Sequence, residues 1–187
     1  MKTDTLPTRD RLIRAAADLF RRRGYHGVGM AELLEAAQAP KGSLYHHFPN
    51  GKSDLALAAA SWASDGMTAV IDASFAEATD FPDGVRTLCH KVAKFFDLSG
   101  QAEGCPITAT LLDGPENAEF RQHAAGLMAN WVDTTTAHGV RLGLSEAEAR
   151  SASEHMLLLL QGGWTVARSQ ANSDVLRSLP DRLTLPH

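Results

Sequence analysis

The sequence predicts an all-α protein, with three short helices at the amino terminus, a larger helical body after them, and about nine helices in all. Two observations predict this class. Apolar residues recur at intervals of three and four through most of the chain, which is the spacing of one helical face. No stretch alternates apolar and polar residues over the length of a half-buried strand. At 187 residues and 44% hydrophobic content, the chain can form an ordinary buried core.

The first three helices are expected within residues 1–52. The apolar face of the first consists of Leu12, Ile13, Ala16, Leu19 and Phe20, with Thr8 predicted as its N-cap and Gly24 as its C-cap. A second, short face consists of Met30, Leu33, Leu34 and Ala37. Pro40 suits the first turn of a third helix, which reaches about His47, because its missing N–H has no helical partner to lose there.

The remaining helices form one continuous body. A long helix is expected from about residue 53 to 78, and no linker separates it from the first three. Further helices are expected over about 81–99, 106–112, 117–142 and 146–169, with a last amphipathic segment from residue 173. Ser145 and Glu148 have the spacing of a capping box. These patterns predict a division into residues 1–52 and residues 53–187.

Charge is distributed unevenly between these parts. The formal net charge of −4 argues by itself against a nucleic-acid binder. Residues 1–55, however, contain nine Lys or Arg against six acidic residues, a net +3, and the remainder contains nine against sixteen, a net −7. Such a split is typical of an anion-binding module attached to an acidic body.

The two cysteines, Cys89 and Cys105, have the spacing of neither a disulfide framework nor a zinc site. The sequence therefore predicts no metal and no cofactor. No signal segment opens the chain, and no apolar run approaches the roughly 20 residues that span a bilayer. We expect a cytoplasmic protein without membrane contact.

Two stretches carry the strongest motif. Residues 24–34 read GYHGVGMAELL and residues 39–48 read APKGSLYHHF. Together they resemble the signature of the TetR family of bacterial transcriptional regulators, specifically over residues 8–55 and beyond that through helix count and order. The later Gly104-Cys105-Pro106 is similar to the LmrA/YxaF branch. The resemblance implies a helix-turn-helix that binds operator DNA, joined to a domain that binds a small molecule and dimerises. It also implies a repressor of neighbouring genes, such as those for efflux or oxidative enzymes.

The third predicted helix has the features that contact with DNA requires. A helix of about two turns is not stable alone, so it must be anchored by packing, and Leu44 and Phe48 supply that anchor. The opposite surface then presents Lys41, Gly42, Ser43, Tyr45 and His46.

Within this surface, Gly42 allows close approach to the groove, and Lys41 is a candidate for base contact because lysine commonly binds guanine O6 and N7. The resemblance places Tyr45, His46 and Lys52 on phosphates of a palindromic double-stranded operator. The alternative is an ordinary solvated face of a small bundle. The helix order, the +3 charge and the motif together favour DNA.

Two residues depart from the family pattern. Gln38 stands where the family usually has Gly, so a left-handed backbone there would cost about 1 kcal/mol, unless the turn differs. Gly29 stands where Ser or Thr normally caps the second helix, which is a milder loss.

The resemblance implies that residues 53–187 bind a ligand and dimerise. The pocket candidates are large, polar or sulfur-containing residues: Trp62, Phe95, Phe96, Cys105, Met128, Trp131, His155, Gln161 and Trp164. They suit a small apolar or aromatic inducer, although an ordinary core position is the more common role of such residues at helical spacing. Residues 156–160 are apolar around nearly the whole helix, which predicts a homodimer with an interface at Leu158, Leu159, Gly162 and Gly163. The alternative is an internal helix of a monomer.

Two other functions explain parts of the sequence. A small helical enzyme would use Cys105 as its nucleophile, because a helix start can activate a thiol, but this leaves the amino-terminal motif unexplained. An architectural DNA-binding protein without a ligand leaves the acidic body unexplained. We therefore predict a non-enzymatic regulator.

Overall fold

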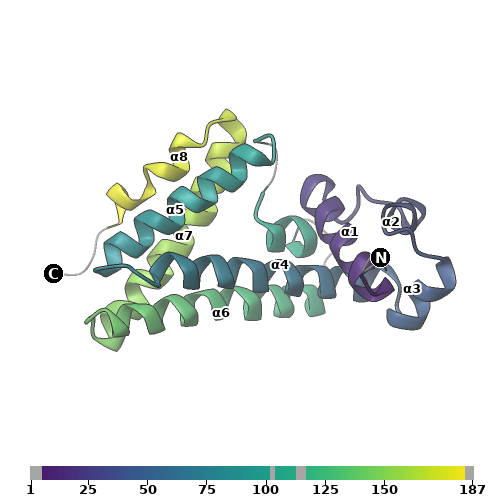
Figure 1. Cartoon of the computed structure of the whole chain (residues 1–187), viewed down its shortest axis with the longest axis horizontal. Helices are drawn as coiled ribbons and strands as arrows, with labels where there is room; N and C mark the ends of the chain where they lie inside the picture. Colours follow the sequence, from purple (N-terminus) through teal and green to yellow (C-terminus); the bar gives the residue numbers. More distant parts are fainter. Residues whose placement is uncertain (1–5, 102–103, 113–116, 184–187) are drawn as a thin grey trace, which may run out of the picture. The chain divides into compact units, whose positions relative to one another are not determined.

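The computed structural model describes residues 6–101, 104–112 and 117–183. Within these ranges every regular element is helical, which confirms the predicted class (Figure 1). The α-helices are α1 (Thr8–Arg23), α2 (Met30–Ala36), α3 (Lys41–His47), α4 (Lys52–Phe75), α5 (Phe81–Leu98), α6 (Ala118–Arg141), α7 (Glu146–Gln170) and α8 (Asp174–Arg177). A π-helical turn, η1, spans Thr108–Leu112, and a 3-10 turn, η2, spans Leu179–Arg182. None of the described helices is long and apolar enough to cross a membrane.

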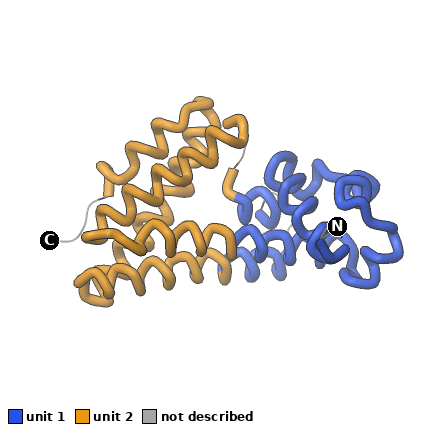
Figure 2. Tube along the Cα trace, viewed as in Figure 1, with its two compact units in different colours: residues 1–64, 106–125 blue, residues 65–105, 126–187 orange. Residues whose placement is uncertain are grey.

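The chain forms two compact units (Figure 2). Unit 1 consists of residues 1–64 and 106–125, and unit 2 of residues 65–105 and 126–187. Both α4 and α6 therefore contribute one part to each unit. The sequence-based division between residues 52 and 53 falls at the first residue of α4, inside unit 1.

In unit 1, α1 is the central element and packs against α2, α3 and η1. Its apolar face is buried as the spacing predicts, with Leu12, Ala16 and Phe20 at 0% exposure. In unit 2, the buried face of α5 includes Val85, Leu88, Cys89, Val92 and Phe96, and α8 and η2 pack against both α5 and α7. Each unit thus has its own core.

The helix ends agree with the sequence in part. Gly24 ends α1 with φ of +68°, and Ser145 and Glu148 form the predicted capping box of α7. The prediction that Thr8 caps α1 is wrong. Pro7 is the N-cap, and its carbonyl already accepts the N–H groups of Asp10 and Arg11, so Thr8 is the first helical residue.

Candidate nucleic-acid interface and sensor unit

The helix α3 is anchored on one side and open on the other. Leu44 is completely buried and Phe48 is 3% exposed, as the sequence predicts. The guanidinium of Arg9 lies 5.7 Å from the centre of the Phe48 ring, which ties the end of α3 to α1. A helix of seven residues depends on such contacts for its position.

The opposite side of α3 presents the predicted residues to solvent. Lys41, Gly42, Tyr45 and His46 are exposed, and Ser43 is half-buried. No atom of the described residues lies within 4 Å of the position that a Cβ on Gly42 would occupy, so the start of the helix is open to close approach.

Tyr45 is positioned by the turn that follows α3. At Gly51, φ is +65°, and an added Cβ would lie 3.2 Å from Tyr45 Cε1. Glycine is thus required there twice, for the left-handed backbone and for the close approach of the tyrosine ring. The phenol remains 46% exposed, which leaves it available to a ligand outside the chain.

Lys52, by contrast, is half-buried and contacts aromatic rings of its own unit. Its Nζ lies 4.3 Å from the centre of the Tyr25 ring and 5.9 Å from that of Phe20. Burial lowers the pKa of Lys52 and raises that of Tyr25. The Tyr25 ring in turn meets Phe120 of α6 edge-on at 5.4 Å. The sequence analysis missed Tyr25 and Phe120, since no local pattern relates residues so far apart in the chain.

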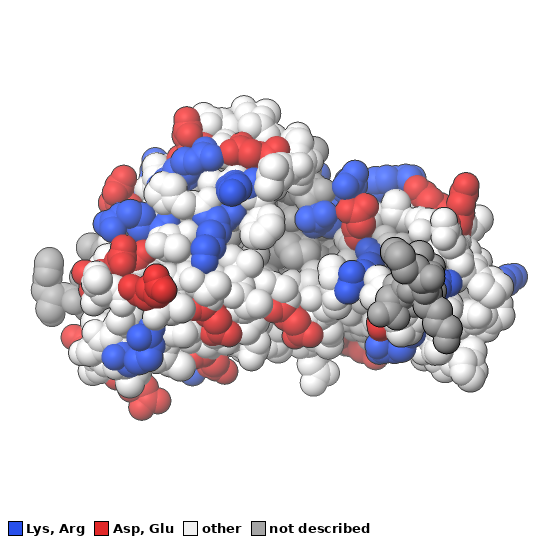
Figure 3. All heavy atoms as spheres, in the orientation of Figure 1, with Lys and Arg blue, Asp and Glu red and all other residues white. Residues whose placement is uncertain are grey.

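The basic residues at the end of α1 are paired with acidic neighbours. Arg21 and Arg22 each place Nη2 3.1 Å from a carboxylate oxygen of Asp18, and Arg23 pairs with Glu32. On the face drawn in Figure 3, acidic and basic side chains are interspersed over unit 1. The net +3 charge of residues 1–55 is therefore not one uninterrupted basic patch on that face.

The turn between α2 and α3 contains a residue with a left-handed backbone, the conformation that the sequence analysis found costly for any residue other than glycine. Gln38 has φ of +49°, and the Arg11 side chain donates hydrogen bonds to the carbonyls of Ala37 and Gln38. The second departure from the family pattern is also present in the structure, where Gly29 is the N-cap of α2.

Comparison with known proteins identifies this arrangement. Residues 12–59 match the family model of bacterial regulatory proteins of the tetR family, and residues 82–181 match that of the C-terminal domain of LmrA/YxaF-like transcriptional regulators. The chain belongs to the TetR family. It is a DNA-binding transcriptional regulator of the LmrA/YxaF-like type, with α2, the turn and α3 as its helix-turn-helix.

Individual relatives cover nearly the whole chain. The HTH-type transcriptional regulator LmrA of Bacillus subtilis is 27% identical over 170 residues, which is 90% of each chain. The crystal structure of regulatory protein TetR from Rhodobacter sphaeroides shares the fold, with a TM-score of 0.80, 24% identity, and coverage of 93% of this chain and 95% of that one. A CifR mutant complexed with a 26-base-pair operator has a TM-score of 0.78 at 20% identity, covering 95% and 96%. Such curated relatives are named as regulators, not as enzymes.

The pocket candidates of this TetR-family chain fall into three groups. Phe96, Cys105, Trp131 and Trp164 are buried, Met128 and Gln161 are half-buried, and Trp62, Phe95 and His155 are exposed. Gln161 Nε2 donates to Cys105 Sγ at 3.4 Å. The indole Nε1 of Trp164 is buried and has no hydrogen-bond partner in the part of the chain that the structure describes. Trp62, in unit 1, is 45% exposed, and the guanidinium of Arg14 lies 5.7 Å from its ring centre.

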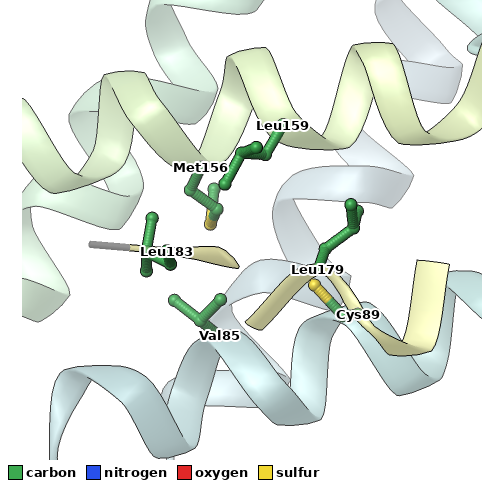
Figure 4. Close-up of a pocket in the computed structure, with 6 residues that line it drawn as sticks. All are labelled: Val85, Cys89, Met156, Leu159, Leu179 and Leu183. Carbon is green, nitrogen blue, oxygen red and sulfur yellow. The ribbon is translucent and has the colours of Figure 1, made fainter. Parts of the chain in front are cut away.

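Unit 2 also contains an apolar pocket that includes none of these nine candidates (Figure 4). It is small, with a volume of about 10 Å³, and is lined by Val85, Cys89, Met156, Leu159, Leu179 and Leu183. Burial raises the pKa of Cys89 to about 12, so its thiol stays neutral. Among the described residues, no group of three or more His, Cys, Asp and Glu could hold a metal ion.

The four predicted interface residues divide between two sides of α7. Leu158 is 68% exposed, and a Cβ on Gly162 would meet no atom of the described part of the chain within 4 Å. Gly163 is buried, and an added Cβ there would lie 2.7 Å from Leu179 Cδ1, while Leu159 lines the pocket beside the same leucine. The close approach that Gly163 permits is therefore to the carboxyl-terminal segment of the same chain.

Proposed function

We propose that this regulator is a repressor that binds a palindromic operator as a homodimer and is released by a small ligand. In this proposal α3 enters the major groove. Lys41 reads a base, Gly42 and Ser43 lie against the groove, and Tyr45 and His46 contact phosphates, supported by their exposure beside the anchored face of the helix. The single observation that carries the proposal is this polar, open side of a helix whose other side is buried.

Lys52 is the sixth proposed DNA contact. Because its ammonium rests on Tyr25 in the free protein, it must leave that ring, at least in part, to reach a phosphate. Binding of DNA would then replace the cation–π contact of Lys52 by a charge-assisted hydrogen bond to a phosphate, which is the stronger interaction at a partly desolvated site.

The proposed dimer forms through the outer side of α7. Leu158, Gly162 and Val166 are successive members of one exposed helical stripe, with His155 at its start. A 68% exposed leucine next to an open glycine suits the close packing of a partner helix. A two-fold dimer would present two copies of α3 to successive major grooves, about 34–36 Å apart.

The proposed ligand is a small apolar or aromatic molecule that also carries a hydrogen-bond acceptor. Within unit 2, the exposed ring of Phe95 is available for stacking. The buried Nε1 of Trp164, which has no hydrogen-bond partner among the described residues, supplies the reason for an acceptor, because a buried N–H without a partner is destabilising.

Continuity of the chain supports coupling between ligand and DNA. The helix α4 begins five residues after α3 ends and runs without interruption from unit 1 into unit 2. A shift of α4 would therefore change the position of α3, and a rigid operator converts a change in the separation of two recognition helices into lost contacts.

Selection of bound duplexes from a random pool, followed by footprinting, tests the DNA proposal. We expect a palindrome with two protected half-sites. An asymmetric site protected by a monomer would contradict it.

Ligand coupling is tested by titrating candidate aromatic compounds with and without the selected duplex. If a compound weakens DNA binding by some factor, the duplex must weaken binding of the compound by the same factor. Equal affinity for the compound in both titrations would reject coupling and leave an architectural DNA-binding protein as the better description.

A further inference from the structure

The α2–α3 turn contains a residue in an unfavourable backbone conformation. Gln38, with φ of +49°, follows the last turn of α2, and the hydrogen bonds around it form a Schellman motif. The N–H of Ala39 donates to Leu34 O and the N–H of Gln38 donates to Glu35 O, both at 3.0 Å. Glycine is the usual residue at this position, because a Cβ destabilises the left-handed conformation. The turn thus needs support from elsewhere in the chain.

Arg11 of α1 supplies contacts at this point. Its Nε donates to Ala37 O at 3.0 Å and its Nη2 to Gln38 O at 3.1 Å. Its Nη1 donates to Leu6 O at 3.1 Å. One guanidinium therefore holds two consecutive carbonyls of the turn and one of the segment before α1.

The geometry of these bonds requires arginine. Two adjacent carbonyls are bound by Nε and Nη2, the two donors that project from one edge of a planar guanidinium. A lysine ammonium is a single point of charge and cannot reproduce this fork. The positive charge also lies at the carboxyl end of α2, where the helix dipole favours a cation.

From this geometry we propose that Arg11 is a positioning residue for the recognition helix, which fixes the α2–α3 turn in its left-handed form and thereby sets the orientation of α3. The seven residues of α3 have Leu44 and Phe48 as their anchor on one side, and the turn is their only covalent support at the amino end. A rotation in the turn would move Lys41, one of the first residues beyond it. Arg11 itself contacts carbonyl groups of the protein, so its influence on DNA is indirect.

This inference rests on the proposed DNA-reading surface of α3, and its test is a double-mutant cycle. The variants are Arg11→Met, which keeps the aliphatic stem, Gln38→Gly, which removes the backbone strain, and the pair together. Arg86→Met removes the same charge from α5, where the guanidinium pairs with Asp83, and serves as the charge control. The probe is the duplex that the wild-type protein selects from a random pool, and affinity is measured over a series of salt concentrations alongside thermal unfolding.

We expect Arg11→Met to weaken DNA binding about tenfold when residue 38 is Gln and at most about threefold when it is Gly. The reason is that Gly adopts the left-handed turn without the hydrogen bonds from Arg11. The dependence of affinity on salt should not change, since no phosphate contact is lost. Arg86→Met should bind like the wild type.

Two results would overturn the inference. An equal loss in both backgrounds, with a weaker salt dependence, would make Arg11 a direct phosphate contact. A lower unfolding temperature with unchanged affinity of the folded protein would make its role purely structural. If the wild-type protein itself selects no sequence, the proposed function of α3 fails first, and this outcome is distinct from the other two.

Discussion

The helices α3 and α7 each have one side that the other described residues leave uncovered, and the two sides differ in chemistry. The open side of α3 carries Lys41, Tyr45 and His46. The open side of α7 carries Leu158, Gly162 and Val166. Cationic and hydrogen-bonding groups suit phosphates and base edges, whereas an aliphatic stripe interrupted by glycine suits another protein surface. We therefore propose different partners for the two helices, DNA for α3 and a second copy of the chain for α7.

The two helices also differ in how they are stabilised. The seven residues of α3 are positioned by side chains from α1 and by the turn before them. The 25 residues of α7 have their own capping box and a continuous buried face. Changes around α3 should therefore affect DNA binding before they affect folding, while changes on the inner side of α7 should affect stability directly.

The largest expected effect comes from the open side of α7. Leu158→Asp should produce a monomer and lower operator affinity by at least about 100-fold, because two recognition helices then no longer bind as one unit. The leucine is 68% exposed, so the fold of the monomer should be unchanged. Analytical ultracentrifugation and gel-shift titration measure the two effects. Val140→Asp, at a 46% exposed position on α6, is the matched control, and a Leu158→Asp protein that remains dimeric would contradict the assignment.

Substitutions on the open side of α3 should have smaller effects on DNA binding, and these effects should fall into two classes. Lys41→Ala should relax base preference at one position in each half-site by about 1–3 kcal/mol, whereas Tyr45→Phe should weaken all sequences to a similar extent. Binding selections on randomised duplexes distinguish the classes. Unchanged binding in both variants would mean that DNA contacts a different surface.

The inner side of α7 is tested by a pair of adjacent glycines. Gly163→Ala should lower the free energy of unfolding by about 1–3 kcal/mol, because the new methyl group would overlap the Leu179 side chain. Gly162→Ala meets open space and should instead raise it by up to about 1 kcal/mol through helix propensity. Urea unfolding in the Leu158→Asp background keeps dimerisation out of the measurement. Equal effects at the two positions would contradict the packing described for α7.

The smallest expected effect concerns the carboxyl-terminal segment, α8 and η2, which packs against the inner side of α7. Hydrogen bonds from Ser173 and Arg177 lower the pKa of Asp97 to about 2, and Arg177 Nη2 lies 2.7 Å from its carboxylate. Because the folded pKa lies below the unfolded one, this pair stabilises the protein above about pH 4 and loses its effect as the pH falls towards 2. The difference in unfolding free energy between wild type and Arg177→Met should be constant near neutral pH and shrink over that acid range. A difference that does not depend on pH would argue against the pair.

Some features of the molecule are visible in local sequence. Helical spacing located α1 to α7 to within a few residues, because an amphipathic face repeats every three to four positions. It did not show that residues 108–112 form a π-helical turn, or that the last segment is divided into α8 and η2. The motif over residues 24–48 identified the family and the exposed side of α3, because Leu44 and Phe48 stand one helical turn apart and leave the other residues outside. The capping box of α7 was equally visible, since its two residues lie three apart.

Other features were decided only by the tertiary structure. The left-handed Gln38 was a recognised difficulty in the sequence, but its stabilisation by Arg11 joins residues 27 apart. Lys52 was expected to contact a phosphate, but its ammonium group lies over the ring of Tyr25, and that ring in turn contacts Phe120. Gly163 was expected to face a partner helix, and it faces Leu179 of its own chain. The sequence by itself determined which residues form helices and which side of each is apolar, because these depend on neighbours within about one turn. Only the tertiary structure decided which distant side chains contact the carbonyls of the α2–α3 turn, the ammonium group of Lys52 and Gly163, because such contacts depend on how the helices pack.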